Sequence, residues 1–166
     1  MAVSAAVIDY MAILCLLAAL AVYDCKHYIL PDKLNAALVV AFVLFHILTR
    51  WSLTTPLMAA EGAAAGGGLL LLIRAAANRF YDDDALGLGD VKLMAAAGLG
   101  LGFPGIMLAL SLGAALGLLH GAAIGWRQRR GGGKVDFRKI NVPAGLGLCG
   151  GTAIVMVLQF GFGWAA

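Results

Sequence analysis

Residues 87–94 read Gly-Leu-Gly-Asp-Val-Lys-Leu-Met, and within them Asp90 opens a long run of small and apolar residues. Such a run is typical of a membrane helix, where a carboxyl group is costly and by default functional. The Gly-x-Gly-Asp pattern alone carries little weight, because the chain has 23 glycines and such strings arise by chance. The position of Asp90 therefore predicts a functional acid that needs a partner from elsewhere in the chain.

The composition indicates an integral membrane protein. Of the 166 residues, 62% are hydrophobic and 13% are charged, whereas soluble domains are about half apolar and about a quarter charged. The first apolar run has no basic segment before it and others follow it, so we expect a retained helix and not a cleaved signal peptide. Cys15, Cys25 and Cys149 form no Cys-x-x-Cys pair, so the sequence predicts no zinc site, no disulfide framework and no cofactor.

We predict a single all-α domain over residues 1–166, built as a bundle of six transmembrane helices of about 20 residues each. The expected spans are residues 4–23, 34–49, 57–77, 85–102, 106–126 and 144–164. The fourth span depends on its start: about 12 residues from Val91 are too short to cross, whereas about 18 residues from Ala85 suffice. Phe103-Pro104-Gly105 is expected to turn the chain before the fifth span. Close helix packing is expected at Gly62, Gly66, Gly113, Gly117, Gly121 and Gly125.

The distribution of basic residues predicts the orientation in the membrane. A basic loop covers residues 127–139, and Lys26 and Lys33 follow the first span. If these face the cytoplasm, Arg50 is the only basic residue outside, so we expect the N-terminus outside. Because the basic residues are assigned to membrane topology, we expect a lipid bilayer and no nucleic acid as partner.

This topology brings Asp24 and Asp90 to the same boundary of the membrane. Asp24 ends the first span, and Asp90 begins the fourth after two further crossings. Two adjacent carboxyl groups share a proton, so one can accept a proton from water while the other polarises a carbonyl. The pair therefore predicts an aspartic peptidase, with Gly87 and Gly89 leaving room for a substrate backbone. The alternatives are a helix N-cap at Asp90 and an interfacial ion pair between Asp24 and Lys26.

Three motifs resemble those of the type IV prepilin peptidase family. They are Asp24-Cys-Lys-His-Tyr-Ile-Leu-Pro31-Asp32, then Gly87-Leu-Gly-Asp90-Val-Lys92, and finally Pro143-Ala-Gly145. The resemblance implies that Asp24 and Asp90 are catalytic, and it places Pro31, Asp32, Lys92 and Pro143 as residues that support the site or bind substrate.

The resemblance also implies a substrate and a location. The substrate would be a prepilin or pilin-like precursor with a basic leader and a hydrophobic helix, cleaved after a glycine just ahead of that helix. The site would face the cytoplasm in the bacterial inner membrane. Longer family members carry a cysteine-containing N-terminal segment associated with N-methylation. This sequence lacks those cysteines and resembles the short branch that serves tight-adherence (Flp-type) pili, so we expect no methyltransferase activity.

The other polar residues can be explained by structural roles that need no catalytic function. Asp32 is expected as the N-cap of the second helix, and Lys92 either tunes Asp90 or extends to the membrane interface. The acids at 82–84 form a solvated loop or attract a basic leader. His46 is expected to pack or to bond a neighbouring helix rather than to bind metal.

Two other kinds of protein remain open. A presenilin-like or signal-peptide-peptidase-like protease would share the Tyr23-Asp24 and Gly87-Leu-Gly-Asp90 patterns, but it would cut within a membrane helix. A proton-coupled transporter could also carry buried acids in a glycine-rich bundle. The sequence predicts neither an oligomeric state nor which precursor is cut.

Overall fold

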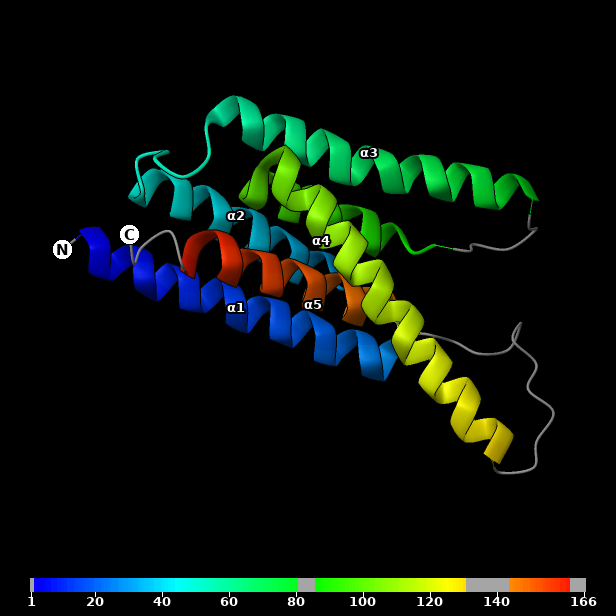
Figure 1. Ribbon diagram of the computed structural model, residues 1–166. Coiled ribbons are helices and arrows are strands. Elements are labelled where there is room, and N and C mark those ends of the chain that lie inside the picture. Colours follow the sequence, from blue (N-terminus) through cyan, green and yellow to red (C-terminus); the bar gives the residue numbers. More distant parts are fainter. Residues whose placement is uncertain (1, 81–85, 131–143, 162–166) are drawn as a thin grey trace.

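The computed structural model describes residues 2–80, 86–130 and 144–161, and these are arranged as a bundle of α-helices (Figure 1). The helices are α1 (Ala2–His27), α2 (Asp32–Leu48), α3 (Pro56–Phe80), α4 (Leu88–Arg130) and α5 (Ala144–Met156), with a π-helical turn over Val157–Gly161. No strand occurs in these three ranges. The expected acidic loop at 82–84, Pro143 and most of the basic loop at 127–139 lie outside the described residues.

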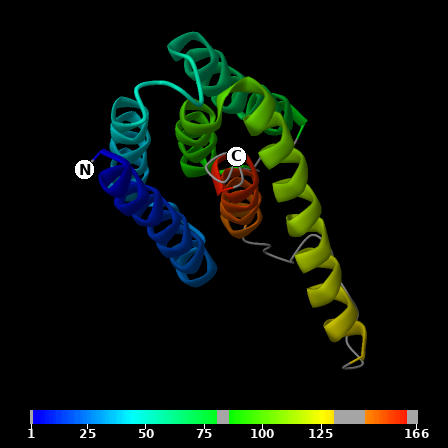
Figure 2. The ribbon, with the colours of Figure 1, turned by 60° about the vertical axis from the view of Figure 1, so that its left-hand side comes forward.

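Helix α4 is bent into two limbs at Gly102. The backbone there has φ 72° and ψ 178°, a conformation that glycine adopts far more readily than other residues. Figures 1 and 2 show that the first limb (residues 88–101) and the second limb (residues 103–130) run back along the bundle in opposite directions. The predicted turn at Phe103-Pro104-Gly105 was therefore wrong by a residue. Pro104 lies instead in the first turn of the second limb, where its missing N–H has no helical partner to lose.

Within the described ranges, three helical segments are long and apolar enough to cross a membrane: Ser4–His27, Pro56–Arg79 and Leu88–Arg127. Helix α2 and the apolar segment Ala144–Phe160 are shorter. The protein is therefore all-helical and has the apolar helices of a membrane protein. Six separate crossings stay a prediction, because the expected fourth and fifth spans form one bent helix.

Close contacts between glycines hold α3 against the first limb of α4. A Cβ atom on Gly62 would lie 2.3 Å from the carbonyl oxygen of Gly98, and one on Gly98 would lie 2.1 Å from that of Gly62. A Cβ atom on Gly66 would lie 2.4 Å from the carbonyl oxygen of Met94. The two backbones therefore touch, which is the close packing expected from the glycine spacing in this part of α3.

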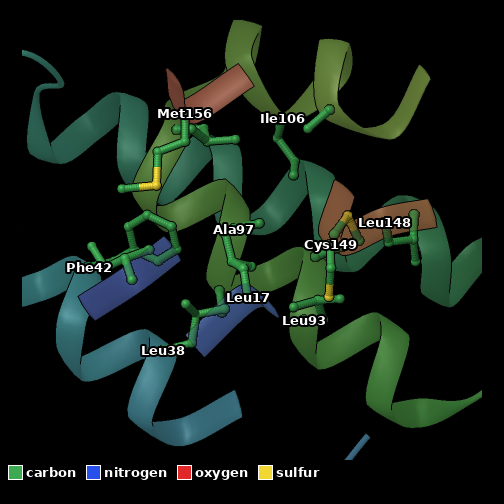
Figure 3. Packing of buried hydrophobic residues seen from close by; sticks show 14 of the residues in the cluster. Leu17, Leu38, Phe42, Leu93, Ala97, Ile106, Leu148, Cys149 and Met156 are labelled. Atoms are coloured by element: carbon green, nitrogen blue, oxygen red, sulfur yellow. The ribbon is translucent and has the colours of Figure 1, made fainter. Parts of the chain in front are cut away.

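The first limb of α4 is at the centre of the hydrophobic core, packed against α2, α3 and α5. Figure 3 shows side chains from four helices meeting around it. They are Leu17 from α1, Leu38 and Phe42 from α2, Leu93, Ala97 and Ile106 from α4, and Leu148, Cys149 and Met156 from α5. Because a limb of only about 14 residues is surrounded in this way, its position in the bundle is fixed from several sides at once.

One end of the bundle gathers the termini of several helices. In Figure 1, α1 and α3 end at the right-hand side, and α2, α4 and α5 begin there. At the opposite end, Nε2 of His46 donates to the carbonyl oxygen of Leu99 at 3.0 Å, and its ring stacks on Trp51. His46 thus makes the bond between helices that the sequence favoured over metal binding.

Candidate active site

A pocket of about 690 Å³ opens at the end of the bundle where α1 ends and α4 begins. We call it the aspartate pocket. It is lined by Asp24, Tyr28, Ile29, Leu30, Pro31, Asp32, Lys33, Gly87, Leu88, Gly89, Asp90 and Lys92. The structure thus brings every expected site residue in its described part to one place, and Pro143 lies outside that part.

Asp24 lies in the last turn of α1 and is held by the start of α5. Its side chain is 5% exposed, and its Oδ2 accepts a hydrogen bond of 3.1 Å from the backbone N–H of Leu146. Leu146 is the third residue of α5, so this N–H has no partner within its own helix, and the positive end of the helix dipole faces the carboxyl group. The described residues show this contact rather than an ion pair between Asp24 and Lys26.

Gly145 makes this approach possible. A Cβ atom at position 145 would lie 2.8 Å from both Cγ and Oδ2 of Asp24. Sequence reasoning did not identify Gly145 or Leu146 as contacts of Asp24. The Pro-x-Gly stretch marked the segment, but its partner 122 positions earlier could not be read from local pattern.

Asp90 is the third residue of α4 and is 8% exposed. Its Oδ1 atom is buried and has no hydrogen-bond partner among the described residues. Because α4 begins at Leu88, Asp90 is inside the helix and is not its N-cap, which corrects that alternative. A buried oxygen without a donor is energetically costly in a folded protein, so this atom is available to a substrate or a water molecule.

The two carboxyl groups line the same aspartate pocket. They come from opposite ends of their helices, since Asp24 is near the end of α1 and Asp90 is near the start of α4. Together they can exchange protons with a bound molecule at two points, which is the property that general acid–base chemistry requires. Among the residues that the structure describes, no group of three or more His, Cys, Asp or Glu side chains could hold a metal ion.

The loop after α1 packs against the start of α4. Tyr28 has φ 53° and donates its backbone N–H to the carbonyl oxygen of Asp24 at 2.8 Å, which ends the helix. A Cβ atom on Gly89 would lie 2.7 Å from Cβ of Leu30. Leu30 thus occupies the space beside Gly89 that the sequence had left for a substrate backbone. At Gly87 the nearest atom to an added Cβ would be Oδ2 of Asp90, at 3.3 Å.

An ion pair lies at the rim of the pocket. Nζ of Lys92 is 2.7 Å from Oδ1 of Asp32, and the two side chains are 50% and 71% exposed. Asp32 was expected as the N-cap of α2, but Pro31 holds that position and Asp32 is the first helical residue. The N-cap assignment was wrong by one residue, because the carbonyl oxygen of Pro31 already accepts the backbone N–H groups of Leu34 and Asn35. The carboxylate of Asp32 instead pairs with Lys92 from α4.

Asn35, which the sequence analysis did not single out, joins α2 to the same turn of α4. Its side chain is 3% exposed, and its Nδ2 donates to the carbonyl oxygen of Gly89 at 3.2 Å. The available signal was a polar residue one turn after Pro31 on an otherwise apolar helix.

A comparison with known families matches most of this chain. The model of the type IV leader peptidase family matches residues 11–122, a range that contains both Asp24 and Asp90. No curated protein and no solved structure matches the chain.

Proposed function

Because this chain belongs to the type IV leader peptidase family, we propose that it is an aspartic-type endopeptidase in which Asp24 and Asp90 activate water. The observation that carries the proposal is that both carboxyl groups line one pocket, and both residues are less than a tenth exposed. Family membership alone indicates a protease; the pair of acids supplies the chemistry.

The proposed reaction uses one proton shared between the two acids. The ionised carboxylate accepts a proton from water as the water oxygen attacks the scissile carbonyl carbon, while the protonated acid donates a hydrogen bond to the carbonyl oxygen. The tetrahedral intermediate then breaks its C–N bond, and the leaving nitrogen takes a proton from the pair. The pair returns to a single shared proton, and the products are a carboxylic acid and an amine.

The low exposure of both side chains supports this chemistry. At 5% and 8% exposure, Asp24 and Asp90 are largely shielded from bulk water. Charges and hydrogen bonds act more strongly in such a setting than in solution. The bond from Leu146 fixes the orientation of Asp24, and the unpartnered Oδ1 of Asp90 leaves one acceptor free for the substrate or the water.

The proposed substrate is a pilin-like precursor of the Flp type, with a basic leader followed by a hydrophobic helix. Cleavage would occur at the cytoplasmic face of the bacterial inner membrane, with the N-terminus of the enzyme outside. The distribution of basic residues supports this orientation. Lys33 lines the pocket, and α1 and α3, which carry Lys26 and Arg79 in their last turns, end on the side of the bundle where α4 begins (Figure 1). Arg50 follows the end of α2, a helix whose first residue lines the pocket.

We propose that each limb of α4 crosses the membrane separately, giving six crossings in all. The first limb, with about 14 residues, spans about 21 Å, which is less than the about 30 Å of a bilayer core. Asp90 at its start would therefore lie somewhat inside the membrane surface. A peptide bond next to the first hydrophobic residues of a membrane-anchored precursor is within reach of such a site.

The test is cleavage of a candidate short pilin precursor by the full-length protein, with the new N-terminus of the product read by mass spectrometry. We expect one cut directly ahead of the hydrophobic segment. A cut within that segment would instead indicate an intramembrane protease of the presenilin kind. No cleavage by an inserted, folded enzyme across several such precursors would reject the peptidase and favour a transporter.

A further inference from the structure

Asn35 is a buried polar residue on a helix that is otherwise mostly apolar. The carbonyl oxygen of Gly89 can only accept a hydrogen bond, so the atom of Asn35 that faces it is the donor Nδ2. The other amide atom, Oδ1, is buried and has no partner among the described residues. A buried amide with one unused acceptor is costly, and the single bond that it makes is to the residue directly before Asp90.

A short path of backbone and hydrogen bonds leads from Asp24 through the loop and Asn35 to Gly89, the residue before Asp90. The backbone N–H of Tyr28 donates to the carbonyl oxygen of Asp24 at 2.8 Å. Three residues further on, the carbonyl oxygen of Pro31 accepts the backbone N–H of Asn35 at 3.2 Å. The side chain of Asn35 then bonds Gly89. Asn35 therefore connects the loop that follows one acid to the turn that carries the other.

We propose that Asn35 is a positioning residue that sets the separation of the Asp24 and Asp90 carboxyl groups. This inference rests on the proposed function, because a fixed separation matters only if the two acids act together. Proton sharing and attack on a carbonyl both depend on distance, and a displacement of about 1 Å can lower a rate about 100-fold. The contact of Leu30 with Gly89 limits how closely the loop and α4 approach. Among the described residues, two polar links join α2 to the start of α4: the ion pair of Lys92 with Asp32, which is half or more exposed, and the buried bond from Asn35.

His46 provides a matched comparison within the same pair of helices. It also extends from α2, and it also donates to a backbone carbonyl of the first limb, that of Leu99. His46 lies in the last turn of α2, whereas the first residue of that helix, Asp32, lines the aspartate pocket. Loss of either bond weakens the packing of α2 on α4, but only the bond of Asn35 lies beside a catalytic acid.

The experiment compares Asn35→Leu, Asn35→Thr and His46→Leu in the full-length protein, with kcat and KM measured on the same precursor. We expect Asn35→Leu to lower kcat at least about tenfold with KM changed less than about twofold, because orientation and not binding is lost. Asn35→Thr supplies a hydroxyl donor and should restore most of kcat. His46→Leu should keep kcat close to wild type. Equal losses of kcat in Asn35→Leu and His46→Leu, or no loss in either, would overturn the proposal.

If Asn35→Leu does not fold, Asn35→Asp takes its place, since it keeps the shape and replaces the donor by an acceptor. A kcat unchanged by that substitution would also overturn the proposal.

A second readout does not need catalysis. Cysteines are introduced at positions 24 and 90 in a protein whose Cys15, Cys25 and Cys149 have been replaced. The measurement is the rate at which a short bifunctional thiol reagent cross-links the two introduced cysteines. We expect the cross-linking rate to fall at least about tenfold when Asn35→Leu is added and to stay unchanged with His46→Leu. If Asn35→Leu slows cross-linking as expected but the wild-type protein cleaves no precursor, the proposed function is rejected and the positioning role of Asn35 is kept. Equal cross-linking rates with and without Asn35→Leu would reject the positioning role.

Discussion

A Cβ atom on Gly145 would lie 2.8 Å from the carboxyl carbon of Asp24, so α5 meets α1 at a position with no space for a side chain. The neighbouring Leu146 uses this proximity to donate its backbone N–H to the same carboxyl group. The geometry of Asp24 thus depends on a segment that follows it by more than 100 positions.

Gly145→Ala should lower kcat about 100-fold, because Asp24 must move away from the added methyl group and lose its alignment. The measurement is precursor cleavage by purified enzyme, with thermal unfolding in detergent as a check on folding. Gly68→Ala is the control, since a Cβ atom there would meet nothing within 4 Å. Equal activity in the two variants would show that the contact does not govern Asp24.

Asp24→Asn and Asp90→Asn should each lower kcat at least about 1,000-fold while the protein still inserts and folds. In the proposed mechanism the two acids share one proton and act as a unit, so the double variant should be about as slow as either single variant. Single-turnover cleavage measures this. Losses that multiply in the double variant would show that the acids act independently.

Gly98→Ala should destabilise the fold by about 1–3 kcal/mol, the range for overpacking a tight core. The added methyl group would lie 2.1 Å from a backbone oxygen of α3, and backbone cannot move aside as a flexible side chain could. Unfolding in detergent by a chemical denaturant gives the change in free energy. Gly117→Ala, which would meet nothing within 4 Å, should change it by less than about 0.5 kcal/mol.

Lys92→Gln should change the free energy of unfolding by less than about 1 kcal/mol, because exposed ion pairs contribute little. The distance of 2.7 Å to Asp32 indicates a formed pair, but both side chains remain half or more exposed. Increasing salt should reduce even this small effect. A loss of several kcal/mol would show that the pair is a major link between α2 and α4.

Local patterns in the sequence were enough for the helical class and for the two acids that the structure places in one pocket. The helical class follows from hydropathy and helix spacing, which depend only on neighbouring residues. The number of predicted crossings between Asp24 and Asp90 then puts the two acids at the same membrane boundary, without any knowledge of how the helices pack. The same local rules misplaced the break in α4, because a glycine outside the expected turn adopted the positive φ.

Contacts between distant segments could not be predicted from local sequence patterns. Asp32 has a residue type that favours an N-cap, yet it pairs with Lys92, 60 positions later. Asn35 and Leu146 bond groups 54 and 122 positions away. Such bonds are decided by which helix faces meet, and a single sequence carries no direct record of that.

The bond from Leu146 to Asp24 also has a consequence for biosynthesis. Ribosomes deliver α1 to the membrane first, and the donor that orients its acid is made 122 residues after that acid. A nascent chain that has inserted α1 to α4 would contain both aspartates but not the group that aligns the first of them. The carboxyl group of Asp24 would therefore be aligned only when α5 packs against α1, a step that follows insertion of the first four helices.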